Sequence, residues 1–165
     1  KPTAMKQLML QNGGFALVDD EDYKELSKYK WYADYRPRSC YIRRMERRNT
    51  PEGPRQRYVY LHRQIMQPPP GMQVDHINSD ATDNRRENLR ICTRSQNNQN
   101  ARRRVDSKHS YKGVWITKGG KYASRIRNGN KRVHIGVYDN EVLAAKAYDQ
   151  KAKELFGAYA KLNFE

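Results

Sequence analysis

Short runs of alternating apolar and polar residues, many of them aromatic, dominate the first third of the chain. Alternation with a period of two is typical of strands that bury one face. One helix is predicted among these runs, from Asp19 to Lys28, and the Pro51–Pro54 segment predicts a turn between the last two strands. The strands are predicted at Phe15–Val18, Trp31–Tyr35, Cys40–Arg47 and Arg57–Leu61.

A proline-rich break at Pro68–Gly71 separates this region from a segment of different character. Met72–Ile77 has strand character, residues 78–87 form a polar loop, and Leu89–Cys92 is a second short strand. Ser95 is well placed to cap a helix that runs to about Arg103. The segment therefore predicts the order strand, loop, strand, helix.

The pattern changes again from Tyr111 onward and predicts a three-stranded antiparallel sheet packed on one helix. Gly119-Gly120 and Asn128–Asn130 supply the two turns. The helix is predicted at Glu141–Phe156 from apolar residues three and four positions apart, and Gly157 is a typical residue to end it. The strands are predicted at Tyr111–Thr117, Lys121–Arg127 and Lys131–Tyr138.

Alternation along these three strands divides their side chains between two faces. The apolar face is expected to pack on the helix and comprises Val114, Ile116, Ser124, Ile126, Val133, Ile135 and Val137. The other face is expected to be free and carries Trp115, Thr117, Arg125, Arg127, Arg132 and His134. Cations beside an indole ring on an open sheet suit a DNA major groove. The alternative is a solvated face with one stray tryptophan.

Composition limits the class of partner. A chain of 165 residues with 36% hydrophobic content can form one compact domain or two small ones with thin cores, which excludes a large enzyme core. Lys and Arg number 33 against 18 Asp and Glu, and the net charge of +15 indicates a polyanion without separating DNA, RNA and anionic membrane. Residues 85–138 alone carry +13, so this stretch is expected to form the nucleic-acid footprint.

No apolar run approaches the roughly 18 residues that span a bilayer, and the N-terminus lacks the charged-then-apolar pattern of a signal peptide. We therefore expect a soluble, intracellular protein without a membrane partner. Cys40 and Cys92 form no C-x-x-C pair, so neither a disulfide framework nor a zinc ribbon is indicated.

A candidate catalytic set combines Asp75, His76, Asn88 and Asn97. Phosphodiester hydrolysis needs a base to deprotonate water and a cation to neutralise charge on the phosphate. A neutral imidazole can be that base, and carboxylate and amide oxygens suit Mg²⁺ or Mn²⁺ better than Zn²⁺. An Asp-His pair alone is more often an ordinary loop-facing pair. Because neighbouring strand residues point to opposite faces, Asp75 and His76 are expected where a strand ends or bulges.

The order and spacing of five short elements carry a resemblance to a known family. These elements are Leu61-His-Arg, Val74-Asp-His-Ile-Asn78, Asp83-Asn-Arg, Glu87-Asn-Leu-Arg90 and Gln96-Asn97. Together they make residues 58–103 closely resemble the HNH endonucleases. The resemblance implies a ββα-metal finger that hydrolyses DNA with one Mg²⁺ or Mn²⁺ per active site.

The resemblance also implies a role for each residue of the set. His76 would be the general base, Asp75 a metal ligand, and Asn88 a support for the loop that orients His76. Asn97 stands where many members have a third histidine and would be the second metal ligand. Three further candidates are Asn100 as a substitute ligand, and His62 and Arg63 as phosphate contacts.

A second resemblance covers about residues 109 to 164 and is carried by Tyr111–Val114, Lys121–Arg127, Ile135–Tyr138, Ala144–Asp149 and Leu162–Phe164. These segments fit the pattern of the AP2 DNA-binding domain. The resemblance implies that bases and phosphates are contacted by Lys112, Trp115, Thr117, Arg125, Arg127, Arg132 and His134. Several of these differ from the residues of plant members, so no target sequence is implied.

These observations predict an α+β protein in three segments. Residues 1–103 would hold an N-terminal β region and the nuclease finger, with the finger core at 58–103; residues 104–109 a basic linker; and residues 110–165 an AP2-like domain. The favoured function is a metal-dependent endonuclease acting on double-stranded DNA as a monomer or homodimer, with a homing or phage-encoded nicking enzyme as one form. A non-catalytic DNA-binding regulator or an RNA-binding module would not require the catalytic set.

Overall fold

The computed structural model describes residues 4–36, 39–101 and 109–164. Within these ranges the chain forms a mixed α+β fold with four small antiparallel sheets, which confirms the predicted class. Contacts divide the chain into two compact units, residues 1–93 and 94–165. Apart from His109, the predicted basic linker lies outside the described residues. None of the described helices is long and apolar enough to cross a membrane.

The N-terminal unit begins with a β-hairpin and a helix. Strands β1 (Met5–Met9) and β2 (Phe15–Asp19) pair antiparallel, and α1 (Asp20–Leu26) follows at once, with three acidic residues in its first turn that favour a helix start. The sequence pattern predicted β2 and α1. It missed β1 because only one residue of that strand is buried, which leaves no apolar alternation to detect.

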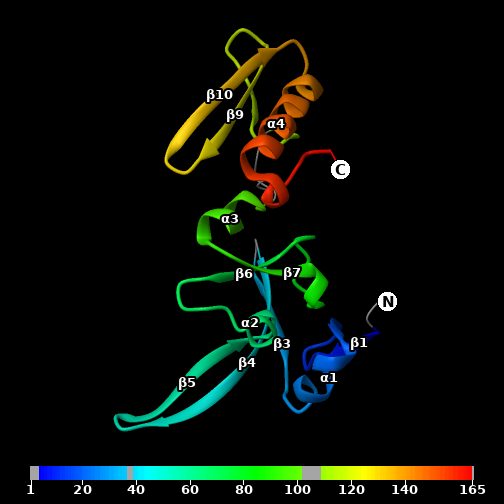
Figure 1. The fold of residues 1–165 in the computed structure, drawn as a ribbon, viewed down its shortest axis with the longest axis vertical. Coiled ribbons are helices and arrows are strands. Elements are labelled where there is room, and N and C mark those ends of the chain that lie inside the picture. Colours follow the sequence, from blue (N-terminus) through cyan, green and yellow to red (C-terminus); the bar gives the residue numbers. More distant parts are fainter. Residues whose placement is uncertain (1–3, 37–38, 102–108, 165) are drawn as a thin grey trace. The chain divides into compact units, whose positions relative to one another are not determined.

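A three-stranded sheet follows, in the order β3-β4-β5, formed by β3 (Tyr32–Arg36), β4 (Ser39–Thr50) and β5 (Gly53–Tyr60). The end of the β4–β5 hairpin extends free of the other elements of its unit (Figure 1). Both strands are longer than predicted, since their arginine-rich ends are exposed on both faces and show no apolar alternation.

Helix α2 (Leu61–Met66) connects this sheet to a second hairpin, formed by β6 (Gln73–His76) and β7 (Leu89–Cys92). The short 3-10 helix η1 (Arg86–Asn88) lies just before β7. α2 was not predicted, because its six residues are too few to establish a helical period. Gln67, at a positive φ of 44°, ends α2 just before the proline-rich break.

One hydrophobic core joins the three sheets of this unit. Trp31 is its largest fully buried side chain, and Trp31 Nε1 donates a hydrogen bond to Leu26 O at 2.8 Å. The core continues through Val18, Leu61 and Leu89, which come from β2, α2 and β7. The β6–β7 hairpin therefore depends on the same core as the N-terminal strands.

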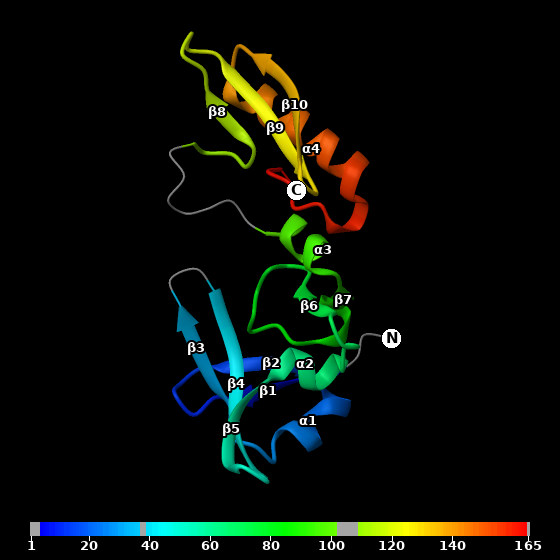
Figure 2. The same cartoon turned by 90° about the vertical axis from the view of Figure 1, so that its left-hand side faces the viewer.

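The C-terminal unit contains α3 (Arg94–Gln99), a sheet in the order β10-β9-β8, and α4 (Glu141–Phe156), followed by the 3-10 helix η2 (Gly157–Tyr159). Its strands are β8 (Val114–Ile116), β9 (Tyr122–Asn128) and β10 (Lys131–Tyr138). α4 lies along one face of the sheet in both views (Figures 1 and 2). It has the predicted bounds, and Asn140 caps it by accepting a hydrogen bond from Leu143 N. α3 is shorter than predicted, since it ends at Gln99 and not at about Arg103, and the predicted cap Ser95 lies inside the helix.

The sheet packs on α4 largely through the predicted face. Val114 packs against Ala144 and Ala145, and Ile126 packs against Tyr148. Two positions of that face were predicted wrongly: Ile116 and Val137 are each 51% exposed. The register of β10 against β9 shifts between His134 and Gly136, and such a bulge moves the residues beyond it out of the simple alternation. Ile116 is the last residue of the short edge strand β8.

Gly113 is expected to be essential for the stability of this unit. Its φ is +79°, and a Cβ there would lie 2.1 Å from Cδ2 of the buried Tyr148. We expect Gly113→Ala to lower the free energy of unfolding by about 2 kcal/mol or more, through overpacking and backbone strain. Urea unfolding of the full chain, followed by circular dichroism, measures this. Gly119→Ala is the control, since its Cβ would come no closer than 4.0 Å to any neighbour, and equal losses in both variants would contradict the account.

Candidate active site

The loop between β6 and β7 is held closed from inside by Asn88. This side chain is 7% exposed, and its Nδ2 donates hydrogen bonds to Asp83 O at 2.7 Å and to Asn78 Oδ1 at 3.0 Å. Its Oδ1 accepts a hydrogen bond from Asn78 N at 3.0 Å. Asn88 thus joins three points of the loop, and these contacts give it a structural position rather than one facing a substrate.

Asp83 forms a second internal contact of the loop. Its carboxylate accepts hydrogen bonds from Arg85 Nε and Nη2, each at 2.8 Å, and from Asn78 Nδ2 at 3.1 Å. The Arg85 guanidinium is the main reason why the pKa of Asp83 lies below its usual value. The buried Asp83 carboxylate is therefore satisfied by two side chains nearer the surface, and these bonds help to fix the loop.

The same loop is attached to the N-terminal hairpin. Leu17 N donates to Thr82 O and Asn84 N donates to Leu17 O, both at 2.8 Å, as in a parallel bridge. Arg86 adds a bond from its backbone N to Asp19 Oδ2 at 2.7 Å. The Arg86 guanidinium also pairs with Asp22 at 2.7 and 2.8 Å. Sequence reasoning did not find Asp19 and Asp22, because the acidic run around α1 gave no sign of a partner more than sixty residues away.

His76 is the last residue of β6, and its ring is oriented by Asn84. Asn84 is fully buried; its Nδ2 donates to Ala81 O at 2.9 Å, and its Oδ1 lies 3.2 Å from His76 Nε2. Because Oδ1 can only accept a hydrogen bond, Nε2 carries the proton and the lone pair lies on Nδ1. Burial lowers the pKa of His76, although Asn84 and nearby carboxylates oppose this. The imidazole therefore has the neutral form that a general base needs.

His62 lies against His76. The two ring centroids are 5.3 Å apart in an edge-on arrangement, and Tyr60 and Tyr41 continue the cluster on the other side of His62. His62 is only 8% exposed, and burial, followed by the charges of His76 and Arg63, lowers its pKa to about 3. His62 thus belongs to the wall of the site. The guanidinium of Arg63 donates instead to Met72 O at 3.2 Å.

Asp75 is buried and bound by Arg90, its cross-strand neighbour on β7. Arg90 Nε and Nη2 donate to Asp75 Oδ2 at 2.9 and 2.7 Å, which orients the carboxylate. The described residues contain no group of three His, Cys, Asp or Glu side chains that could hold a metal ion. Asp75 nevertheless fits a hard divalent ion by its donor chemistry, provided that amide, water and phosphate oxygens complete the coordination.

The structure brings Asp75, His76, His62 and Asn88 together in the N-terminal unit. The two remaining candidate metal ligands, Asn97 in α3 and Asn100 just beyond it, belong to the C-terminal unit. The position of Asn84 could have been noticed in the Asp83-Asn-Arg element, but nothing in that element indicated a bond to His76.

Most candidate DNA-binding residues lie on the free face of the C-terminal sheet. Arg125 lies over the Trp115 ring at 4.7 Å, and His134 contacts the same ring edge-on. Arg127 and Arg132 are opposite each other in the register of β9 and β10. An open sheet face with this charge can accept phosphates and base edges.

Two of the candidates have local partners. Thr117 Oγ1 accepts a hydrogen bond from Lys121 N at 3.2 Å in the turn after β8. Lys112 Nζ donates to Gln99 O at 2.9 Å and to Ala101 O at 2.7 Å, and burial lowers its pKa to about 8. Lys112 thus supports the end of α3 within its own unit.

Comparison with known proteins shows which sequences resemble this chain. A family model described as HNH endonuclease matches residues 59–99. An uncharacterised HNH endonuclease of Acanthamoeba polyphaga mimivirus is 32% identical over 155 residues, which is 92% of this chain and 75% of the relative. No solved structure matches the chain significantly.

Plant proteins match a smaller part of the chain. An ethylene-responsive transcription factor of Arabidopsis thaliana, ERF010, is 43% identical over 56 residues, or 33% of this chain and 30% of the relative. APETALA2-like protein 2 of Oryza sativa is 39% identical over 57 residues, or 33% of this chain and 13% of the relative. The chain therefore corresponds to less than a third of each of these plant proteins.

The buried His62 predicts acid-sensitive folding. Its folded pKa of about 3 lies below the unfolded value of about 6.5, so its stabilising contribution is complete above about pH 6.5 and is lost as pH falls toward 3. The free energy of unfolding should fall by up to about 1.4 kcal/mol per pH unit in this window. Urea unfolding at pH 7.5 and pH 5 measures the loss, and His62→Phe should reduce it while keeping a ring beside Tyr60.

His134→Phe is the matched control, since His134 is exposed on the C-terminal sheet. Its acid sensitivity should equal that of the unmodified chain. The same acid sensitivity in His62→Phe would show that His62 is not the buried group responsible.

Proposed function

This chain belongs to the HNH endonuclease family, and we propose that it hydrolyses phosphodiester bonds of double-stranded DNA with His76 as the general base and one divalent metal ion per active site. The observation that carries this proposal is the environment of His76. The imidazole is half-buried, bonded through Nε2 to Asn84, and next to Asp75 at the end of β6. A neutral base beside an oriented carboxylate is the arrangement that phosphodiester hydrolysis requires.

In the proposed reaction, His76 Nδ1 accepts a proton from a water molecule while the water oxygen attacks phosphorus. One P–O ester bond breaks, and the leaving oxygen takes a proton from solvent. Asn84 holds the proton on Nε2, so that the lone pair is on Nδ1 when the step begins. Asn88 acts at a distance by keeping the loop closed around this pair.

Asp75 and Asn97 would hold the metal ion, Mg²⁺ or Mn²⁺, with Asn100 as a substitute ligand. When bound, the ion would neutralise charge on the phosphate and on the leaving oxygen. Arg90 would keep the Asp75 carboxylate in a fixed orientation before the ion arrives. In this proposal β6, β7 and α3 correspond to a ββα-metal finger, and His62 and Arg63 line the side from which phosphate approaches.

The C-terminal unit would be an AP2-like domain that holds the DNA. Its three-stranded sheet on one helix, and the similarity of a third of the chain to a plant transcription factor, support this assignment. The proposed contacts to bases and phosphates are Trp115, Thr117, Arg125, Arg127, Arg132 and His134, with Lys112 nearby. One finger per chain is compatible with nicking by a monomer and with double-strand cleavage by a homodimer, and a homing or phage-encoded enzyme would use either.

Conversion of supercoiled plasmid tests the reaction. The purified chain should nick or linearise the plasmid with Mg²⁺ or Mn²⁺ and not with EDTA, and His76→Ala should lower the rate on the order of 10²-fold to 10⁴-fold. DNA binding by the variant should be retained. If the unmodified chain binds diverse DNA tightly but cuts none with any of these metals, it is a DNA-binding regulator and the proposal is wrong.

The role of Asn84 predicts a difference between two variants of similar size. Asn84→Leu removes the acceptor for Nε2 and should lower kcat about 10-fold to 100-fold, with little change in KM for DNA. Asn84→Asp keeps an oxygen at that position and should retain more of the rate. Cleavage kinetics, with circular dichroism to check folding, measure both. A Leu variant that is folded and cuts at the original rate would contradict the assigned proton position.

A further inference from the structure

The β4–β5 hairpin is more strongly charged than folding of its unit requires. Between residues 43 and 60 it carries six arginines, no lysine and two glutamates, a net charge of +4. From Arg47 to Tyr58 almost every side chain is exposed on both faces of the ribbon. An isolated two-stranded ribbon gains little stability by itself, so this composition indicates a partner for the hairpin.

Four of the arginines share one face. The register pairs Arg44 with Val59, Glu46 with Arg57, and Arg48 with Arg55, and these side chains alternate with those of the opposite face. We call the set Arg44, Glu46, Arg48, Arg55 and Arg57 the arginine face. Arg48 and Arg55 are direct cross-strand neighbours, an arrangement that destabilises a sheet unless an anion compensates for it.

Glu46 arranges the arginine face. Its Oε2 accepts hydrogen bonds from Arg48 Nε at 2.9 Å and from Arg57 Nε at 2.6 Å, and its Oε1 lies 3.4 Å from Arg44 Nη2. Each of the two Nε bonds uses one edge of a guanidinium, and about half of the Arg48 and Arg57 side chains stays exposed. The carboxylate therefore fixes the cations without neutralising the face. Glu52 pairs with Arg55 at 3.3 Å, so two negative charges stand among four positive ones.

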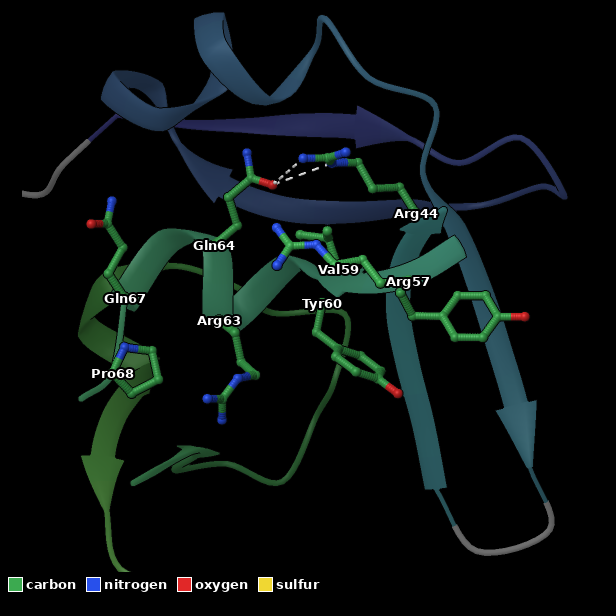
Figure 3. A pocket seen from close by; sticks show the side chains of 9 residues that line it. Arg44, Arg57, Val59, Tyr60, Arg63, Gln64, Gln67 and Pro68 are labelled. Carbon is green, nitrogen blue, oxygen red and sulfur yellow. Dashed lines mark hydrogen bonds between the residues drawn. The ribbon is translucent and has the colours of Figure 1, made fainter. Parts of the chain in front are cut away.

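The arginine face continues into a hollow beside α2. Arg44 and Arg57 line this hollow together with Tyr60, Arg63 and Gln64. Figure 3 shows the side chains of Arg44 and Arg57 running from the strands toward α2, where Gln64 Oε1 bonds the Arg44 guanidinium. The surface thus has a fixed shape at the end nearest the helix.

α2 also connects this surface to the active site. His62, two residues before Gln64 in α2, packs on the His76 ring. The helix is six residues long, or about 9 Å. DNA carries one phosphate charge for every 1.7 Å or so of its axis, so a duplex cut at His76 brings further phosphates within reach of the arginine face.

We propose that the arginine face binds the phosphate backbone of the duplex beside the bond that is cut, as a DNA contact separate from the C-terminal sheet. This inference rests on the proposed function, which supplies DNA as the substrate. The all-arginine composition favours phosphate, because a guanidinium can present two parallel N–H donors to it and an ammonium cannot. The face positions the backbone and does not read the base sequence.

The salt dependence of DNA binding tests the inference. Binding of the full chain to a fluorescently labelled duplex of arbitrary sequence is measured over a range of salt concentrations, in EDTA so that no DNA is cut. Arg48→Ala/Arg57→Ala should weaken binding and lower the slope of log K against log salt by roughly 0.9 for each phosphate that the variant no longer neutralises. Arg48→Lys/Arg57→Lys should keep most of the slope and bind more weakly than the unmodified chain.

Arg47→Ala is the matched control, because Arg47 lies on the same strand but its side chain belongs to the opposite face. It removes the same charge as Arg48→Ala alone and should leave the slope unchanged. If Arg47→Ala weakens binding as much as a single Arg48→Ala, or if the double variant is folded and binds like the unmodified chain, the inference is wrong. Tighter binding to an RNA duplex, with a larger effect of the double variant there, would also overturn it.

The plasmid assay distinguishes this inference from the proposed reaction. At saturating DNA the double alanine variant should cut at nearly the original kcat with a raised KM, whereas His76→Ala loses kcat. If the unmodified chain cuts no DNA but the double alanine variant still lowers the salt slope, the proposed reaction is wrong and the arginine face still binds DNA. If the unmodified chain cuts DNA and the double variant has unchanged KM and salt slope, only the proposed DNA contact of the arginine face is wrong.

Discussion

The attachment of the β6–β7 loop to the N-terminal hairpin is the interaction on which the rest of the site depends. Two backbone hydrogen bonds to Leu17 and the pairing of Arg86 with Asp19 and Asp22 fix the loop from outside. Asn88 fixes it from inside. Without these bonds the Asn84 side chain would not be held in one orientation. The proton of His76 would then not be fixed on Nε2. The N-terminal strands therefore help to build the candidate site.

The buried polar groups of the site carry a free-energy penalty, and they also make the loop rigid. Asn84, Asn88, Asp83 and Asp75 are all less than a tenth exposed, and a buried polar group without a partner costs about 1 to 3 kcal/mol. Each of them has partners within hydrogen-bonding distance. A unit with one thin core can tolerate such groups because backbone carbonyls and half-buried arginines satisfy them, and the result is an imidazole held in a fixed orientation.

The sequence predicted the elements that local signals define. α4 was predicted with its observed bounds because its apolar spacing and its terminal Gly157 mark them. β7 was also predicted with its observed bounds, Leu89–Cys92. The family resemblance, and not the pattern of apolar residues, pointed to His76 and Asp75. The roles of Asn84, Asp19 and Glu46 were beyond prediction, since each depends on partners that only the folded chain brings near. The bulge in β10 likewise has no signal in the alternation, which is why Val137 was placed on the wrong face.

The central claim is that the fold holds His76 as a neutral imidazole with its proton on Nε2 and its lone pair on Nδ1. Nitrogen-detected NMR of the histidine rings in the labelled full chain at neutral pH tests it directly, with His76→Ala used to assign the signal. The account predicts the neutral Nε2–H tautomer for His76. In Asn84→Leu it predicts that His76 no longer has a single neutral tautomer. A neutral Nδ1–H tautomer, or a protonated ring at neutral pH, would contradict it.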